Sequence, residues 1–292
     1  MTAVPKAESA DPVLRVVGMT HRYGKRVVLD DVSFDLVAGE VVAVVGPSGA
    51  GKTTLFRCIT QLISADAGRV ELAGRDLAAL TGAELRRARR DIGLVFQQYN
   101  LVRRMSALDN VLAGRLADMA TWRVLARMPG PEERASALAC LERVGLADHA
   151  TKRADRLSGG EQQRVAIARA LAQRSRVVLA DEPVSSLDPS AATKVLAALR
   201  SIARDDGIAV LCSLHQVPMV AGFADRVVGL RSGKVVPDSP VLSSTSGTTR
   251  PSTASEPAEV ATPTSAIREV QRQAVSSGLP SDASRGRDQL GL

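Results

Sequence analysis

The 292-residue sequence contains few aromatic side chains and few cysteines. Aromatic residues make up 2% of the chain, whereas apolar residues as a whole make up 45%. A hydrophobic core must therefore rest on Val, Leu, Ile and Ala. The three cysteines, Cys58, Cys140 and Cys212, are far apart in apolar or helical contexts. Their odd number and wide spacing argue against a disulfide framework or a zinc site, and we expect buried free thiols.

Long apolar runs are also missing. No run approaches the length of about 20 residues that a membrane-spanning helix requires. The first residues, MTAVPKAESADPVL, lack the apolar segment of a secretory signal, so we expect a soluble, cytoplasmic protein.

The formal net charge is +7, from 38 Lys and Arg against 31 Asp and Glu. A basic surface explains this excess without nucleic acid, because the main basic cluster has no interleaved aromatic residues. We interpret this cluster as the solvated face of a helix expected over 82–90, and we expect no nucleic-acid partner. The cluster comprises Arg86, Arg87, Arg89 and Arg90.

The apolar pattern predicts strands and helices that alternate on either side of a helical insert, as in an α/β fold. Short β-rich stretches lie between Val13 and Leu36, with a turn at Tyr23-Gly24-Lys25 and a hairpin at about 67–75. Strongly apolar strands are expected at 41–45, 92–96, 177–181 and 208–211. Residues 99 to about 170 lack strand signals; there we expect a helix capped by Ser106 and another over 132–144.

The ends of the chain differ in character from its middle. Residues 1–11 are polar and predict a flexible arm. Residues 239–292 are rich in Ser, Thr and Pro and predict a disordered tail, because such a segment cannot bury enough apolar surface to order itself. The predicted folded domain spans 12–238, with its helical subdomain at about 99–165.

A glycine-rich stretch follows the apolar run at 41–45 and precedes a predicted helix. It matches the phosphate-loop pattern G-x-x-x-x-G-K-[ST] in its required strand-to-helix setting. Glycines allow backbone N–H groups to surround phosphate oxygens, and the helix directs its positive end at the same anion. Lys52 is expected to reach the β- and γ-phosphates, and the Thr53 hydroxyl to bind Mg²⁺. The ATP-binding residues are predicted to be Gly46, Pro47, Ser48, Gly49, Ala50, Gly51, Lys52, Thr53 and Thr54.

An acidic pair ends a later apolar strand. Asp181 and Glu182 come directly after Val177–Ala180. At the carboxyl end of a strand beside a phosphate loop, Asp181 can hold the Mg²⁺ shell. Glu182 then faces the γ-phosphate as a general base, so the sequence predicts hydrolysis as well as binding.

The stretch Leu157-Ser158-Gly159-Gly160-Glu161-Gln162-Gln163-Arg164 resembles the signature motif of the ABC ATPases. This resemblance, which covers about residues 13–236, implies a phosphate-loop NTPase with a RecA-like core, an antiparallel β subdomain and an all-α helical subdomain. It implies a homodimer in which Ser158, Gly159, Gly160 and Asp188 contact ATP bound to the partner.

Further positions match the family in order. The resemblance implies that Tyr23 stacks on adenine, that Gln97 binds Mg²⁺ and positions water, and that His215 contacts the γ-phosphate. Gln98 is an alternative to Gln97, which we favour because it directly follows Phe96.

Several blocks look like the phosphonate-import ATP-binding subunits within this family. They include Val95–Val102, Asn110–Leu116, Thr121-Trp122-Arg123 and Ser213–Val217. This likeness implies an ATP- and Mg²⁺-dependent ATPase on the cytoplasmic face of the membrane. It would act with a permease dimer and, through the permease, with a solute-binding protein. Ser239-Pro240 and the long tail depart from the pattern.

Three other interpretations remain open at this stage. One is an importer ATPase for methionine, a polar amino acid or another substrate. A second is a non-transport ABC ATPase, although the single cassette and the absence of zinc spacing argue against it. A third is a subunit of the carbon–phosphorus lyase machinery, which would bind cytosolic enzymes in place of a permease.

Overall fold

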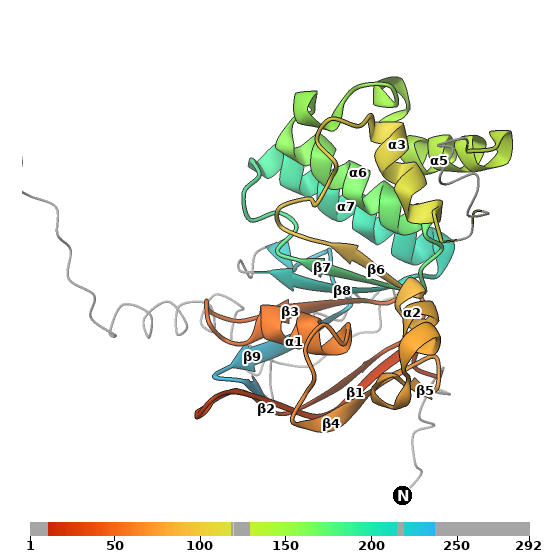
Figure 1. Ribbon diagram of the computed structural model, residues 1–292. Coiled ribbons are helices and arrows are strands. Elements are labelled where there is room, and N and C mark those ends of the chain that lie inside the picture. Colours follow the sequence, from red (N-terminus) through yellow and green to blue (C-terminus); the bar gives the residue numbers. More distant parts are fainter. Residues whose placement is uncertain (1–10, 118, 120–128, 215–218, 237–292) are drawn as a thin grey trace, which may run out of the picture. The chain divides into compact units, whose positions relative to one another are not determined.

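The computed structural model describes residues 11–117, 119, 129–214 and 219–236 (Figure 1). The predicted arm and tail lie almost entirely outside these residues, so they stay predictions. The chain divides into a unit of residues 1–245 and a unit of residues 246–292, and only the first contains described residues.

The centre of the fold is a six-stranded sheet with the order β10-β9-β3-β8-β7-β6. All neighbouring pairs are parallel except β10 and β9, which are antiparallel. The strands are β3 (Val41–Val45), β6 (Ile92–Val95), β7 (Val177–Asp181), β8 (Ala209–Leu214), β9 (Arg226–Arg231) and β10 (Lys234–Val236).

Both faces of this sheet are covered, which explains why its strands are apolar at nearly every position. In β3, Val41 and Ala43 pack into one hydrophobic cluster, and Val42 and Val44 pack into a second on the opposite face. The strands β7 and β8 divide in the same alternating way. Aliphatic residues supply most of the close packing on both sides, with few aromatic side chains, such as Phe223 in one cluster and Phe56 in the other.

Helices cover one face of the six-stranded sheet, above it in Figure 1. They are α3 (Ala107–Leu112), α5 (Pro131–Arg143), α6 (Gly159–Ala172) and α7 (Pro189–Asp206). Short 3-10 helices connect them: η2 (Ala113–Arg115), η3 (Ala147–His149) and η4 (Ala154–Arg156). Between β6 and β7 the described residues contain no strand beyond an isolated bridge of Ser106 and Arg153, as the sequence predicts.

The other face carries a second, antiparallel sheet with the order β2-β1-β4-β5. Its strands are β1 (Leu14–Tyr23), β2 (Arg26–Leu36), β4 (Ala67–Leu72) and β5 (Arg75–Asp76). Helix α1 (Lys52–Ile59) buries Leu55, Phe56, Cys58 and Ile59 in the cluster shared by the two sheets. Helix η1 (Leu77–Ala79) and α2 (Gly82–Arg90) follow the second sheet along the chain.

Most of the predicted elements are confirmed, including both hairpins and the Ser106 cap, whose Oγ accepts from the Asp109 N–H at 3.1 Å. The three cysteines are buried and free, as expected. Helix α7 and the strands β9 and β10 were not among the predicted elements.

The arginine cluster on α2 needs a partial correction. Arg86, Arg87 and Arg90 are exposed, as predicted. Arg89 instead donates to the carbonyls of Thr60 and Gln61 at 3.0 and 2.6 Å. These groups follow the last turn of α1, where carbonyls lack helical partners, so Arg89 stabilises the end of that helix.

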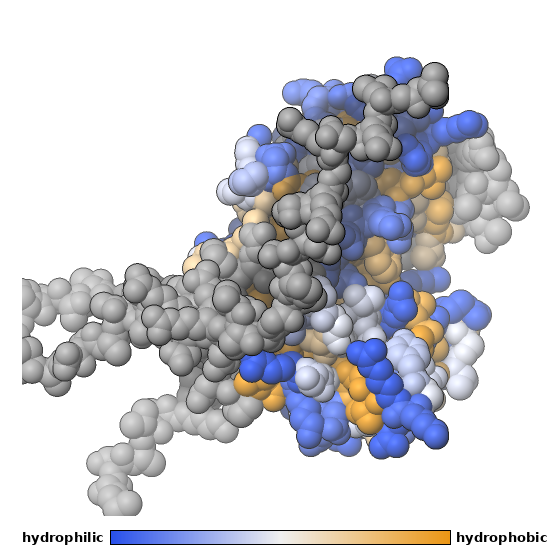
Figure 2. All heavy atoms as spheres, turned by 90° about the vertical axis from the view of Figure 1, so that its left-hand side faces the viewer, coloured by the Kyte–Doolittle hydropathy of each residue, from blue (hydrophilic) through white to orange (hydrophobic). Residues whose placement is uncertain are grey.

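The surface is mostly polar where it can be seen in Figure 2, with hydrophobic residues interspersed among hydrophilic ones. Within the described ranges, the exposed large hydrophobic residues are Tyr23, Val27, Leu62, Val102, Met105, Leu116, Leu138 and Val236. Among the helices that the structure describes, none combines the length and hydropathy that a bilayer-spanning segment needs.

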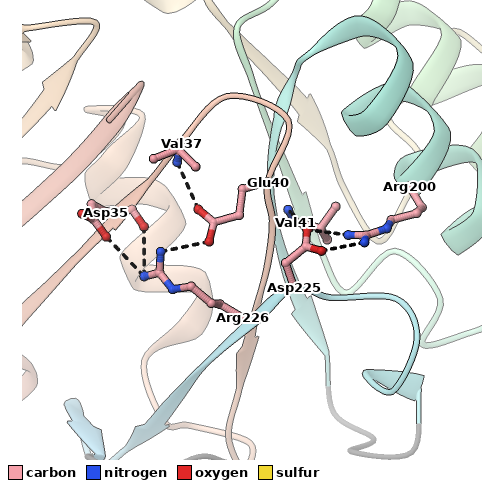
Figure 3. Close-up of polar contacts among 7 residues, drawn as sticks. All are labelled: Asp35, Val37, Glu40, Val41, Arg200, Asp225 and Arg226. Carbon is pink, nitrogen blue, oxygen red and sulfur yellow. Dashed lines mark hydrogen bonds and ion pairs between the residues drawn. The ribbon is translucent and has the colours of Figure 1, made fainter. Parts of the chain in front are cut away.

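Two ion-pair groups connect the layers next to the start of β3 (Figure 3). Arg226 donates to the side chains of Glu40 at 2.9 Å and Asp35 at 3.2 Å, which connects β9 to β2. Arg200 on α7 donates to both oxygens of Asp225, which also accepts from the Val41 N–H at 2.9 Å. Asp225 therefore connects α7, β3 and the start of β9.

Substituting Asp225→Asn should destabilise the fold by about 1–2 kcal/mol at pH 7, because the partly exposed pair loses its charge. Burial raises the pKa of Asp225, but Arg200 and the Val41 N–H outweigh it and hold that pKa below its usual value. The carboxylate's contribution is therefore present above pH ~4 and is lost as the pH falls through the lowered pKa. Urea unfolding between pH 7 and pH 3 measures this difference.

The matched control is Asp148→Asn, at an exposed aspartate in η3. We expect its free energy of unfolding to stay within about 0.5 kcal/mol of the wild type. If Asp225→Asn were as stable as this control at pH 7, Asp225 would not be a structural link.

Candidate nucleotide-binding site

The candidate site lies at the carboxyl edge of the parallel strands. The register pairs Val45 with Leu214 and Asp181 with Ser213, so β3, β8 and β7 end level with one another. The glycine-rich loop after β3 and the acidic pair at the end of β7 therefore lie along the same edge. In open α/β sheets, ligands bind at this edge.

The loop from Gly46 to Gly51 packs so tightly that two of its glycines have no room for a side chain. A Cβ on Gly46 would lie 2.1 Å from the Leu230 carbonyl oxygen, and one on Gly51 would lie 2.7 Å from that of Val28. Gly49 differs, because nothing would touch its Cβ, but its φ of +79° favours glycine. Steric contact and backbone conformation together explain the pattern of glycines.

Lys52, the first residue of α1, is buried inside this loop. Its Nζ donates to the carbonyls of Gly46 at 2.8 Å and Pro47 at 3.2 Å. Burial lowers its pKa, while the charges of Glu182 and Asp181 act in the opposite direction. A buried ammonium group that donates to two carbonyls of this loop is well suited to bind phosphate oxygens, which fits a nucleotide.

Thr53 lies in the first turn of α1 and is exposed. The N–H groups of this first turn lack helical partners and point towards the loop. The neighbouring residue Thr54 is partly buried. The Thr53 hydroxyl and the Asp181 carboxylate are oxygen ligands of the kind that Mg²⁺ prefers, and the phosphates of the nucleotide would supply others. The donor set at this edge therefore fits a magnesium–nucleotide complex.

Ser213 fixes the acidic pair, a role that the sequence analysis missed. Its buried Oγ donates to Asp181 Oδ1 at 2.8 Å and accepts from the Glu182 N–H at 2.8 Å. Glu182 has a φ of +50°, a conformation that costs energy for a residue other than glycine. The Ser213 hydroxyl thus helps hold Glu182 in the strained turn in which the chain changes direction after β7.

Gln97 lies two residues beyond Val95, the last residue of β6, and is exposed. Since Val95 pairs with Ala180, Gln97 follows the strand end next to the acidic pair. Gln98 is exposed as well, so exposure does not distinguish the two. His215 lies outside the described residues, directly after β8.

Tyr23, at the end of β1, presents an aromatic ring that is 49% exposed. Its ring meets the buried His21 ring edge-on, with 4.7 Å between centroids. The strand that pairs with β1 also borders the loop, where Val28 lies against Gly51. Tyr23 is therefore available to stack on a base, as the resemblance implies.

The remaining predicted residues lie at the ends of helices on the opposite face of the sheet. Ser158 caps α6 in a reciprocal arrangement with Glu161, whose carboxylate accepts from the Ser158 N–H at 2.7 Å. Asp188 caps α7 by accepting from the Ala191 N–H at 3.0 Å.

Within the described residues, no hydrogen bond or ion pair joins Ser158, Gly159 or Gly160 to the phosphate loop of the same chain. Helix α1 packs in the cluster under one face of the sheet and α6 in the cluster on the other. The chain thus carries two helix N-termini suited to anions, on opposite faces.

Fold and site together define a phosphate-loop ATPase cassette. The family model described as "ABC transporter" matches residues 29–185, and the chain belongs to this family.

Curated relatives are about half identical to this chain. The hypophosphite import ATP-binding protein HtxD of Stutzerimonas stutzeri is 49% identical over 78% of this chain and 67% of its own length. The phosphonates import ATP-binding protein PhnC of Frankia casuarinae is 50% identical over 77% of this chain and 89% of its own.

Solved structures agree with this fold. The cbiO1 protein of Clostridium perfringens has a TM-score of 0.70 at 26% identity, over 78% of this chain and 88% of its own. A bacterial ABC transporter cassette solved as a dimer has a TM-score of 0.67 at 35% identity, over 76% of this chain and 96% of its own. A post-hydrolysis state of that cassette contains ADP and Pi.

Gly46→Ala should lower the affinity for ATP by at least about tenfold, because the added Cβ would have to displace the Leu230 backbone. In the matched variant Gly49→Ala, the added Cβ contacts no neighbouring atom. This variant should be destabilised only by the strain of its positive φ, about 1–2 kcal/mol. Titration with a fluorescent ATP analogue, together with thermal unfolding, measures both effects. Equal affinities for the two variants would contradict the steric explanation.

Proposed function

We propose that this chain is the ATP-hydrolysing subunit of an importer for phosphonate or a related phosphorus oxyanion. The observation that carries the ATPase assignment is the level alignment of the phosphate loop with Asp181 and Glu182. The substrate class is supported by relatives that are 49% and 50% identical and are named for hypophosphite and phosphonate import. Other importer substrates are the alternative.

In the proposed reaction, Lys52 and the loop N–H groups bind the β- and γ-phosphates. Glu182 accepts a proton from a water that attacks the γ-phosphorus in line, and ADP leaves. Thr53, Asp181 and Gln97 would hold Mg²⁺, which neutralises charge on the phosphates. Tyr23 stacks on the adenine, and His215 contacts the γ-phosphate.

The second half of the site is proposed to come from another copy of the chain. Ser158–Gly160 and Asp188 would contact the nucleotide bound to the partner's phosphate loop. The positions of α1 and α6 on opposite faces of the sheet support this arrangement, as does a related cassette solved as a dimer. Closure on ATP and reopening after phosphate release would then drive transport.

The surface after Gln97 is proposed to receive a membrane permease. Val102 is 53% exposed and Met105 is 37% exposed, so this loop presents two large apolar side chains to a partner. The buried Asn110 amide holds this loop by accepting from the Val102 N–H at 2.8 Å and donating to the Val102 carbonyl at 3.2 Å. A permease at this position would place the subunit peripherally on the membrane and connect it to a solute-binding protein.

The uptake of radiolabelled methylphosphonate by the host cell tests this function. Deletion of the gene should abolish uptake, and the wild-type gene should restore it. Glu182→Gln should not restore uptake, because the amide cannot accept the proton, although the purified variant should still bind ATP.

Two outcomes would overturn parts of the proposal. Unchanged methylphosphonate uptake after deletion would argue against the substrate class, and the same assay with hypophosphite would then test the other relative's substrate. If Glu182→Gln hydrolysed ATP as fast as the wild type with the permease present, Glu182 would not be the general base. Co-purification with cytosolic enzymes in place of a permease would favour the lyase alternative.

A further inference from the structure

The segment that follows Gln97 has an unusual backbone. Tyr99 and Asn100 have φ angles of +59° and +48°, and neither is a glycine. Two hydrogen bonds close the turn, from the Tyr99 N–H to the Phe96 carbonyl at 3.1 Å and from the Asn100 N–H to the Gln98 carbonyl at 2.6 Å. Such conformations cost about 1–3 kcal/mol each and persist where surrounding contacts impose them.

Arg169, in the third turn of α6, supplies one such contact. Its guanidinium donates to the Asn100 carbonyl at 2.6 Å and to the Tyr99 carbonyl at 3.3 Å. Burial lowers the pKa of this guanidinium, so these carbonyls replace much of the water that it has lost. A planar fork with several N–H donors can hold two adjacent carbonyls at once, which an ammonium group does less well.

The Tyr99 side chain contacts the other end of the same helix. A Cβ on Gly159, the first residue of α6, would lie only 2.7 Å from the Tyr99 hydroxyl oxygen. Gly159 and Arg169 are ten positions apart, or about 15 Å along the helix. The turn after Gln97 is thus hydrogen-bonded to α6 through Arg169, and the Tyr99 side chain lies against the start of the same helix, about three turns away.

Resting on the proposed function, we propose that Arg169 and Tyr99 are positioning residues that make the Gln97 turn and helix α6 move as one unit. Gln97 would contact the γ-phosphate in its own site, whereas Ser158–Gly160 would contact the nucleotide of the partner. Because the Gln97 turn and helix α6 are held together, a change in the contact between Gln97 and its γ-phosphate would move Ser158–Gly160. These residues contact the γ-phosphate of the other site. The contact between Tyr99 and Gly159 would therefore matter for turnover more than for nucleotide affinity.

A double-mutant cycle on the full-length chain tests this coupling. Gly159→Ala should lower kcat about tenfold through the contact with the Tyr99 hydroxyl. Binding of ATP to the phosphate loop of the same chain, to which Gly159 makes no described bond, should change by less than about twofold. Adding Tyr99→Phe removes that oxygen. The remaining neighbours of the new methyl group are then Leu187 Cδ2 at 3.2 Å, at the end of a flexible side chain, and the ring carbon Cζ at 3.7 Å. The double variant should regain at least half the kcat of Tyr99→Phe alone.

Arg169→Lys provides a second, independent probe. It should lower kcat while retaining ATP affinity, because one ammonium group cannot reproduce both hydrogen bonds. The matched control is Arg115→Lys, at an arginine that reaches a different carbonyl of α6, that of Ala172, at 3.4 Å. If both variants lost thermal stability and kcat in parallel, Arg169 would have only a structural role.

The outcomes separate this inference from the function on which it rests. A double variant that stays as slow as Gly159→Ala, beside an active wild type, would overturn the coupling and leave the ATPase assignment intact. A wild-type chain that binds but never hydrolyses ATP, with its permease present, would overturn the proposed function itself.

Discussion

The register of the parallel strands is the constraint on which the site depends. β3, β8 and β7 are buried on both faces, and a shift of one residue would turn every apolar side chain towards the wrong cluster. Packing therefore fixes the register, and the register fixes which residues follow the strand ends. This register brings together the phosphate loop, the acidic pair and the Ser213 hydroxyl. The packing of the core therefore also determines the geometry of the site.

The two faces of the sheet carry different halves of the proposed reaction. The face with α1 supplies the loop, Lys52 and Thr53, whereas the helical face supplies the capped N-terminus of α6. In the proposed arrangement the site is complete only when a partner supplies Ser158–Gly160 and Asp188, which would couple the chemistry to the association of subunits. The turn after Gln97 connects the two halves within one chain, since it begins at the carboxyl edge of the sheet and is held by Arg169 on α6.

Local patterns predicted the loop, the acidic pair and the Ser106 cap, because each is a short stretch whose chemistry dictates its residue types. Ser213, Arg89 and Arg169 could not be found this way, since each acts on groups far away in sequence that only folding brings near. Helix α7 and the strands β9 and β10 were missed although signals exist. Asp188-Pro189 and Gly207 mark the helix ends, and Ser232-Gly233 marks the hairpin turn. The catalytic and nucleotide-binding roles of the site residues, including those of Gln97 and His215, stay predictions.

Each active site is proposed to need residues from two chains, and an experiment that mixes two inactive variants tests this arrangement. Lys52→Ala removes the phosphate contact, and Ser158→Glu would place a carboxylate beside the partner's γ-phosphate; each variant alone should be inactive. When they are mixed, half of the dimers should be mixed dimers with one intact site, which predicts up to about a quarter of the wild-type ATPase rate. A mixture that forms dimers on ATP but stays inactive would contradict a site shared between chains.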